Sequence, residues 1–288
     1  MDKAEEKDQV ATEYIITYGW AIIIIVTILL ALYEFGVFNS IVQGPRLPPG
    51  SCFVYKSSAG STLQGLCNGQ PEYIGAFSGT TQPGIPRGPS AYVAVNDIYL
   101  NTSGGGTNTA MFWLYWNGTV NATPIGFPGY YMWASPSGCF GFVTGNKNDY
   151  GISSSSISGK WVFVTAVFYN GQAVGNDKLY IDGVQQTMSQ CYGTTHSGSV
   201  ANPILIGSTA GTRIAWYGDI ADVQIYNNTL SQAEIQGTYK EGMGGAPVTL
   251  RNLIGWWPLN GNTNDYSGNE QNGQSVGALN YLGGYSYP

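Results

Sequence analysis

The stretch KWVFVTAVFYNGQAVGNDKLYIDGVQQT, residues 160–187, carries the strongest structural signal in the chain. Residues 161–169 are apolar at almost every position, so both faces of an extended segment would be apolar. Such a strand is typical of the middle of a sheet that is covered on both sides. Further on, Asp182-Gly183 separates two extended runs, and this dipeptide tolerates the positive φ angles of a two-residue hairpin turn. The stretch therefore predicts a central strand followed by a β-hairpin.

Similar turn signals recur along the chain. Asn117-Gly118, Asn170-Gly171 and Asn260-Gly261 each follow a short apolar run. Short strands between such turns predict an antiparallel all-β sandwich, or jelly roll, over residues 51–288. One short helix is expected at residues 231–239, where Ser231 and Glu234 form a capping-box pattern.

The composition excludes two classes of protein. The 288 residues include 11 Lys and Arg against 17 Asp and Glu, so the net charge is −6. A nucleic-acid binder needs a basic surface to neutralise phosphates, and this chain has none in excess. A disordered chain is poor in apolar residues, whereas here 43% are hydrophobic and 14% aromatic. A large folded core is expected.

The N-terminal part predicts a long hydrophobic helix. No charge occurs from Tyr14 to Tyr33, and 20 helical residues span about 30 Å, the thickness of a bilayer's hydrocarbon core. Because every face is apolar, the helix must be surrounded by lipid or by other helices. Prolines at 45, 48 and 49 end it. The predicted organisation is a leader at 1–8, a filament-core or transmembrane helix at 9–40, a linker at 41–50 and the β domain at 51–288.

The segment KDQVATEYIITYGW, residues 7–20, resembles the class III signal region of archaeal type IV pilin-like proteins. The resemblance implies that a prepilin peptidase cleaves between Asp8 and Gln9, and that Glu13 becomes the assembly residue at mature position five. A carboxylate at the edge of an apolar helix needs a positive partner, which the new amino group of Gln9 in a neighbouring subunit would supply.

By this resemblance the protein is a subunit of an extracellular filament, either an adhesion pilus or an archaellum. It would polymerise with itself as a helical homopolymer, after a membrane-embedded precursor stage handled by the peptidase and the membrane assembly machinery. A plain single-pass membrane anchor is the alternative. The helix positions expected in the filament core are Tyr14, Tyr18, Trp20, Ile24, Leu29 and Tyr33.

Residues 159–186 and 203–239 also resemble the back half of laminin-G-like, concanavalin-A-like jelly-roll domains. Residues 253–273, LIGWWPLNGNTNDYSGNEQNG, resemble the opening strand of that domain but come last. A circularly permuted jelly roll is therefore expected, with residues 253–288 pairing beside strands of the 90–120 region. Donation of this segment to a neighbouring subunit is the alternative. This resemblance supports a second function, a membrane-anchored or minor pilin-type adhesin that binds surface glycans through the jelly-roll domain.

The four cysteines follow the apolar helix in a domain expected to face the exterior, where disulfides form. Three pairings are open. Disulfides between Cys52 and Cys67 and between Cys139 and Cys191 are favoured, because each closes a local loop. Each disulfide would stabilise the fold by about 3 to 4 kcal/mol. Four buried free thiols are the alternative. Asn-X-Ser/Thr acceptors for glycosylation occur at Asn101, Asn117, Asn121 and Asn227.

Catalytic residues are not expected, and the protein is interpreted as a non-enzyme. No nucleophile, metalloprotease or phosphate-loop motif is present, and the single histidine, His196, lies in a polar loop.

Jelly rolls of this type sometimes hold Ca²⁺ on Asp and Asn oxygens, and turn chemistry is the alternative for such a set. No cofactor is otherwise expected. With few carboxylates, folding should depend weakly on acid. The carboxylates weighed as catalytic groups are Asp219 with Asp222, and Asp149 with Asp177 and Asp182; the Ca²⁺ candidates are Asn262, Asn264 and Asp265.

Overall fold

The structure is a computed structural model of the chain. It describes residues 18, 20–28, 30, 52–56, 62–67, 70–77, 91–145, 148–173, 175–194, 197–209, 214–277 and 279–283. The chain divides into two compact units, Met1–Leu47 and Pro48–Pro288.

In the first unit, residues 20–28 are helical, as are Tyr18 and Leu30. Tyr18, Trp20 and Ile24 expose 60%, 64% and 55% of their surfaces. Across the described part of the chain, no helix is both long and apolar enough to cross a membrane. The predictions for the leader, the linker, Asp8, Gln9, Glu13, Tyr14, Leu29 and Tyr33 lie outside the described residues.

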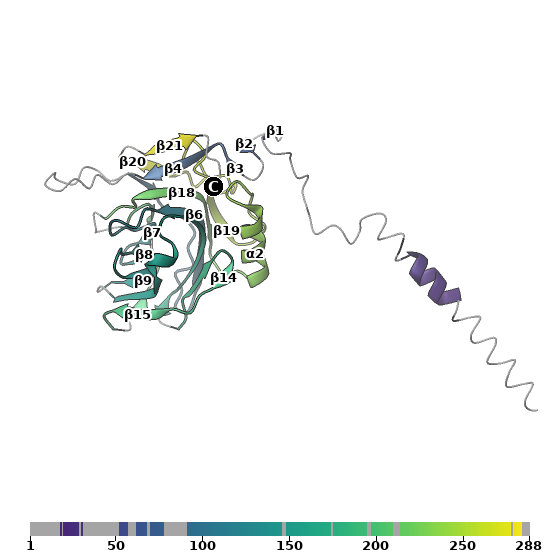
Figure 1. Cartoon of the computed structure of the whole chain (residues 1–288), viewed down its shortest axis with the longest axis horizontal. Coiled ribbons are helices and arrows are strands. Elements are labelled where there is room, and N and C mark those ends of the chain that lie inside the picture. Colours follow the sequence, from purple (N-terminus) through teal and green to yellow (C-terminus); the bar gives the residue numbers. More distant parts are fainter. Residues whose placement is uncertain are drawn as a thin grey trace, which may run out of the picture. The chain divides into compact units, whose positions relative to one another are not determined.

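The second unit is a sandwich of two eight-stranded antiparallel sheets (Figure 1). We call them the front sheet and the back sheet. The front sheet has the order β15 (Ser189–Tyr192), β10 (Asn148–Ser153), β9 (Cys139–Thr144), β8 (Tyr130–Ala134), β7 (Ile125–Phe127), β17 (Ile204–Ile206), β5 (Tyr92–Val95), β20 (Gln274–Val276). The back sheet has the order β14 (Val184–Gln185), β13 (Lys178–Ile181), β11 (Trp161–Tyr169), β6 (Thr107–Trp116), β18 (Gly218–Tyr226), β4 (Tyr73–Phe77), β21 (Asn280–Gly283), and β19 (Leu253–Trp257) also pairs with β18.

Smaller elements complete the unit. Strand β2 lies between β1 and β3 in a short sheet, and β12 pairs with β16. Their bounds are β1 (Cys52–Lys56), β2 (Thr62–Cys67), β3 (Gln70–Pro71), β12 (Gly171–Gln172), β16 (Ser197–Gly198), a 3-10 helix η1 (Ser154–Ser156) and helix α2 (Gln232–Glu241).

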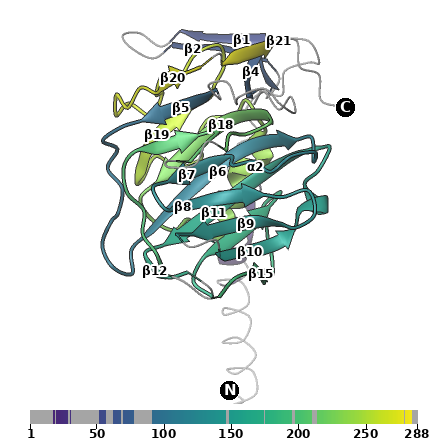
Figure 2. The same ribbon diagram turned by 90° about the vertical axis from the view of Figure 1, so that its left-hand side faces the viewer.

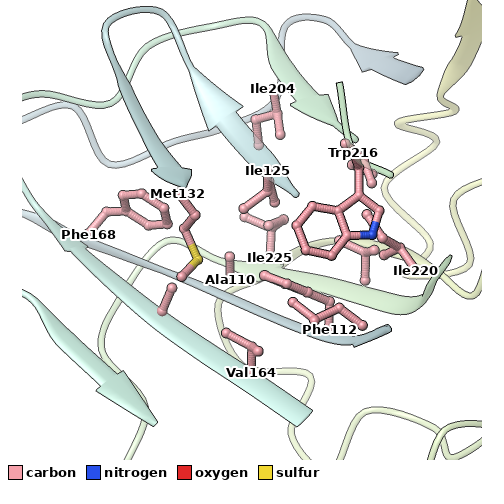
Figure 3. Close-up of a cluster of buried hydrophobic side chains, with 14 of the residues drawn as sticks. Ala110, Phe112, Ile125, Met132, Val164, Phe168, Ile204, Trp216, Ile220 and Ile225 are labelled. Carbon is pink, nitrogen blue, oxygen red and sulfur yellow. The ribbon is translucent and has the colours of Figure 1, made fainter. Parts of the chain in front are cut away.

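The main core fills the space between the two sheets (Figure 3). Met132 of β8 and Ile125 of β7 point into it from the front sheet, and Phe168 of β11 points into it from the back sheet. Trp216, which precedes β18, is fully buried in the same cluster. The alternation of apolar residues along each strand produces this layer, because successive side chains point to opposite faces.

The central part of the back sheet is buried on both faces. Along β11, Val164 and Phe168 belong to the core between the sheets, whereas Phe163 and Val167 belong to a second apolar cluster on the outer face. Helix α2 lies over that face (Figure 1), and its Tyr239 ring stacks on Trp113 of β6 at a centroid distance of 5.7 Å. The predicted central, doubly covered strand is therefore confirmed.

The predicted hairpin and helix are also confirmed. In the β13–β14 turn, Asp182 and Gly183 have φ angles of 51° and 75°, and Ile181 pairs with Val184. Helix α2 begins after Ser231, whose Oγ accepts a hydrogen bond from the Glu234 backbone N–H. The Glu234 side chain in turn accepts from the Ser231 backbone N–H at 2.8 Å, which completes the capping box.

Substituting the capping residue should weaken the domain measurably. Ser231→Ala removes an acceptor for the first turn of α2, so we expect the free energy of unfolding to fall by about 1 kcal/mol. Urea denaturation followed by tryptophan fluorescence measures this. Gln236→Ala, at an exposed position of the same helix, is the control and should change stability little. Equal effects of the two substitutions would show that the cap is not stabilising.

The C-terminal strands differ in part from the prediction. Strand β20 pairs with β5, in the 90–120 region as expected, but β19 pairs with β18 and β21 pairs with β4. The prediction for β19 was wrong, because β6 already has β11 and β18 as its two neighbours. Strands β4 and β19 instead pair with successive parts of β18, β4 with residues 218–220 and β19 with residues 223–226. All three strands pair within one chain in this structure.

Candidate functional site

The candidate site lies on the outer face of the front sheet, which faces the viewer in Figure 2. Strand β8 alternates strictly: Tyr130, Met132 and Ala134 are fully buried in the core, while Tyr131 and Trp133 point outward and are half-buried. The Tyr131 and Trp133 rings lie edge to face at a centroid distance of 6.5 Å. Two large aromatic rings are therefore presented side by side on this face.

A carboxylate shares the face with these rings. Tyr131 pairs with Val143 of β9, Val143 pairs with Asp149 of β10, and Asp149 pairs with the exposed Tyr192 of β15. Paired residues point to the same side of a sheet, so these four form a row. Val143 is buried. Among the described residues, no hydrogen-bond donor or cation contacts the Asp149 carboxylate, although Gln190 donates to its backbone carbonyl at 3.3 Å.

The charge of Asp149 acts on the Tyr131 hydroxyl across the intervening strand β9. Burial raises the pKa of Asp149. Burial, and secondly the negative charge of Asp149, raise the pKa of the Tyr131 hydroxyl. The Tyr131 hydroxyl thus keeps its proton and can donate a hydrogen bond. The ionised Asp149 carboxylate has no proton, so it acts as an acceptor and not as a donor.

The adjacent row lacks side chains in its middle. Trp133 pairs with Gly141, Gly141 with Gly151, and Gly151 with Ser189. A Cβ atom at either glycine would collide with the backbone of the facing strand. Close strand packing therefore requires both glycines, and both are buried.

A disulfide holds the edge of this face. Cys139 of β9 and Cys191 of β15 are joined, with Cα atoms 6.2 Å apart and β10 between their strands. The predicted disulfide between Cys139 and Cys191 is therefore confirmed. It ties down the edge strand that carries Tyr192. Cys52 and Cys67 lie opposite each other in the register of β1 and β2.

Two of the carboxylates that were weighed as catalytic groups, Asp177 and Asp222, accept hydrogen bonds that hold the fold together. Asp177, which precedes β13, accepts hydrogen bonds from the hydroxyls of Tyr130 and Tyr150 in the front sheet, and from the Tyr169 backbone N–H at 2.9 Å. Burial raises its pKa to about 8, while the Tyr130 and Tyr169 hydrogen bonds oppose the shift. Asp177 therefore links the two sheets.

Asp222 lies in a bulge of β18, with a φ angle of 51°. Its carboxyl accepts hydrogen bonds from Trp256 Nε1 at 2.7 Å and from Gln224 Nε2 at 3.0 Å. Burial raises its pKa to about 7, against the effect of these two hydrogen bonds. Tyr226 extends the network by donating to Gln224 Oε1 at 3.0 Å. Asp222 thus links β19 to β18, and the residue is buried.

The structure separates the second set of carboxylates, and the Ca²⁺ set of Asn262, Asn264 and Asp265 stays a prediction. Asp182 accepts from the Phe163 backbone N–H in the β13–β14 turn, so Asp149, Asp177 and Asp182 lie on different faces. Asp265 accepts from the backbone N–H groups of Trp256, Ser267 and Gln271, which is turn chemistry. Within the described part of the chain, no group of three or more His, Cys, Asp or Glu residues could hold a metal ion. His196 lies outside that part.

The four glycosylation acceptors differ in their surroundings. The side-chain oxygens of Asn101 and Asn117 accept from the backbone N–H of Ser103 and Thr119, at 3.3 and 3.1 Å. Asn121 is exposed. The Asn227 amide donates a hydrogen bond to the Tyr99 carbonyl at 3.3 Å. Glycosylation stays a prediction at all four.

Two packed antiparallel sheets define this domain as an all-β jelly-roll sandwich. Sequence comparison gives its family. The family model described as the concanavalin A-like lectin/glucanases superfamily matches residues 87–236, which are 150 of the 288 residues. The chain belongs to this superfamily.

One solved structure supports the same fold, and a second is more distantly similar. A candidate carbohydrate binding protein from Bacteroides ovatus ATCC 8483 is 15% identical, with a TM-score of 0.50, over 82% of this chain and 70% of that one. A heptameric SAP-like pentraxin from Limulus polyphemus is 16% identical, with a TM-score of 0.37, over 58% of this chain and 81% of that one. No curated protein sequence matches the chain.

Proposed function

We propose that the β domain is a glycan-binding module and that its ligand lies on the outer face of the front sheet. The observation that carries the proposal is the pair of half-exposed rings, Tyr131 and Trp133, on the same face as the unpartnered carboxylate of Asp149. An aromatic ring offers an apolar face to the C–H groups of a sugar. The carboxylate accepts hydrogen bonds from sugar hydroxyls, and polar groups placed in this way fix orientation.

The comparisons support this proposal at the level of the fold. The superfamily description includes lectins, and the similar Bacteroides protein is described as a candidate carbohydrate binder. At 15% identity its ligand does not transfer to this chain. The chemistry of Tyr131, Trp133 and Asp149 therefore remains the main support.

Glycan binding should be lost when the rings are removed. We expect the full chain, in detergent, to bind neutral glycans on an array, and Trp133→Ala to weaken binding about tenfold or more, since a buried aromatic contact contributes at least about 1.4 kcal/mol. Tyr99→Ala is the matched control, because Tyr99 is 72% exposed and belongs to neither row. Unchanged binding by Trp133→Ala and by Tyr131→Ala would overturn this site.

We also propose that the face binds glycans without cleaving them. Glycosidases generally need two carboxyl groups across the scissile bond. Asp149 is the one carboxylate among the described residues of the front-sheet strands. Incubation with the bound glycan should release no reducing ends, whereas turnover that Asp149→Asn abolishes would contradict this interpretation.

For the N-terminal unit we propose that the apolar segment 14–33 polymerises the protein into an extracellular pilus-like filament. Large apolar side chains of the described helical residues support this, because Trp20, Ile22 and Leu30 are each more than half exposed and need a lipid or helical partner. Mass spectrometry of native material should find Gln9 as the first residue. An intact leader, together with detergent-free material that is monomeric, would favour a simple anchor or no membrane role.

A further inference from the structure

A second unpartnered carboxylate lies on the opposite side of the sandwich. Asp219 of β18 is half-buried, and burial raises its pKa to about 6. Among the described residues, no donor or cation contacts its carboxyl group. Asp177 and Asp222, in contrast, each accept hydrogen bonds from at least two side chains. Half-buried carboxylates usually have a partner, and one that the fold does not use points to a binding function.

The register gives Asp219 a defined set of neighbours. Asn280 of β21 pairs with Ala76 of β4, Ala76 with Asp219, Asp219 with Tyr115 of β6, and Tyr115 with Trp161 of β11. All five side chains point to the outer face of the back sheet. Asn280 is exposed, and Ala76 and Tyr115 are half-buried. The rings of Tyr115 and Trp161 are 6.1 Å apart.

This row lies just beyond the part of the back sheet that α2 covers. The neighbouring row contains Ala221, Trp113 and Phe163, which are buried in the apolar cluster beneath Tyr239 of α2. The row of Asp219 is therefore the border of the covered surface. A ligand there would meet an apolar wall on one side and solvent on the other.

The row has the same components as the front face: aromatic rings, an unpaired carboxylate and a small or apolar residue beside it. It adds an amide, because Asn280 lies two strands from Asp219. Two strand spacings amount to about 9.5 Å, which a hexose with its hydroxyls can bridge across the small side chain of Ala76.

We propose that Asp219, Tyr115 and Asn280 form a second glycan-binding site, on the back sheet. This inference rests on the proposed function of the domain, since it assigns the same ligand chemistry. The two sites face away from each other across a sandwich whose sheets pack about 10 Å apart, so one sugar ring cannot occupy both. The domain would then hold two glycan chains at once and crosslink them.

The experiment places a reporter in each site. Full-length chain containing 5-fluorotryptophan is titrated in detergent with the methyl glycosides of glucose, galactose, mannose and N-acetylglucosamine, and followed by fluorine NMR. The Trp133 signal reports on the front site and the Trp161 signal on the back site, each assigned from its Trp→Phe variant. We expect at least one glycoside to shift both signals.

Substitutions then separate the sites. Asp219→Leu should abolish the Trp161 shift and keep the Trp133 shift, and Asp149→Leu should do the reverse. Asp219→Leu should also keep or raise the melting temperature, because it removes a desolvated charge without a partner. A Trp133 shift alone would overturn the second site and leave the proposed function intact. A Trp161 shift alone would overturn the front site, and no shift of either signal would overturn both.

Discussion

Acidification from pH 8 to pH 4 is expected to stabilise the β domain against unfolding. Burial raises the pKa of Asp177 to about 8, of Asp222 to about 7 and of Asp219 to about 6, from an ordinary value of 3.8. In this window the folded state holds protons that the unfolded chain has released. The free energy of unfolding therefore falls as pH rises through these values, by on the order of 2 kcal/mol or more, which replaces the weak dependence expected from the small number of carboxylates.

Urea denaturation at pH 4, 6 and 8 measures this effect, and the apparent free energy should be greatest at pH 4. Asp177→Asn should flatten the dependence between pH 6 and 8, because the amide carries no titrating proton. Glu234 acts in the opposite sense, since its hydrogen bonds to Ser231 lower its pKa, but its contribution is lost only below about pH 4. A domain that gains stability from pH 4 to pH 8 would contradict the assignment of these buried acids.

Phe168→Ala is expected to destabilise the domain by about 4 kcal/mol, the cost of removing a large aromatic side chain from a packed core. Phe168 is fully buried between the sheets (Figure 3). Its ring meets those of Phe127, Tyr130 and Phe142 of the front sheet edge to face, at centroid distances of 5.0 to 5.1 Å. The substitution would leave a cavity at the contact that joins the two sheets.

Thermal or urea unfolding of the purified full chain measures the loss. Phe168→Leu should cost less, because most of the volume is retained. Tyr99→Ala, at an exposed position, should change stability by less than about 0.5 kcal/mol. If Phe168→Ala were no worse than Tyr99→Ala, the two sheets would not be packed against each other through this ring.

Much of the β domain follows from local sequence signals. The uniform apolar character of residues 161–169, the Asp182-Gly183 turn and the Ser231 to Glu234 pattern each specify one element, and each element is found. Pairings between distant strands do not follow from such signals. Strand β19 pairs with β18 because β6 has no free side, and that depends on the order of the whole sheet.

The candidate site was only partly visible in the sequence. Asp149 is a single acid in a turn-rich chain, and grouping it with Asp177 and Asp182 placed together residues that lie on different faces. The useful signal was the alternation in residues 130–134, where Tyr131 and Trp133 are both out of phase with the buried Tyr130 and Met132. The structural role of Asp222 could not be predicted from the sequence, because it depends on a bulge in β18 that brings the Asp222 carboxyl into hydrogen-bond contact with Trp256 of β19.

The central claim is that a glycan binds to the outer face of the front sheet. The most direct test is a structure of the full-length chain in complex with the glycan that binds best on the array. A sugar ring within about 4 Å of the Trp133 or Tyr131 ring, with a hydroxyl donating to Asp149, is the predicted result. A glycan bound only elsewhere on the domain would contradict the claim.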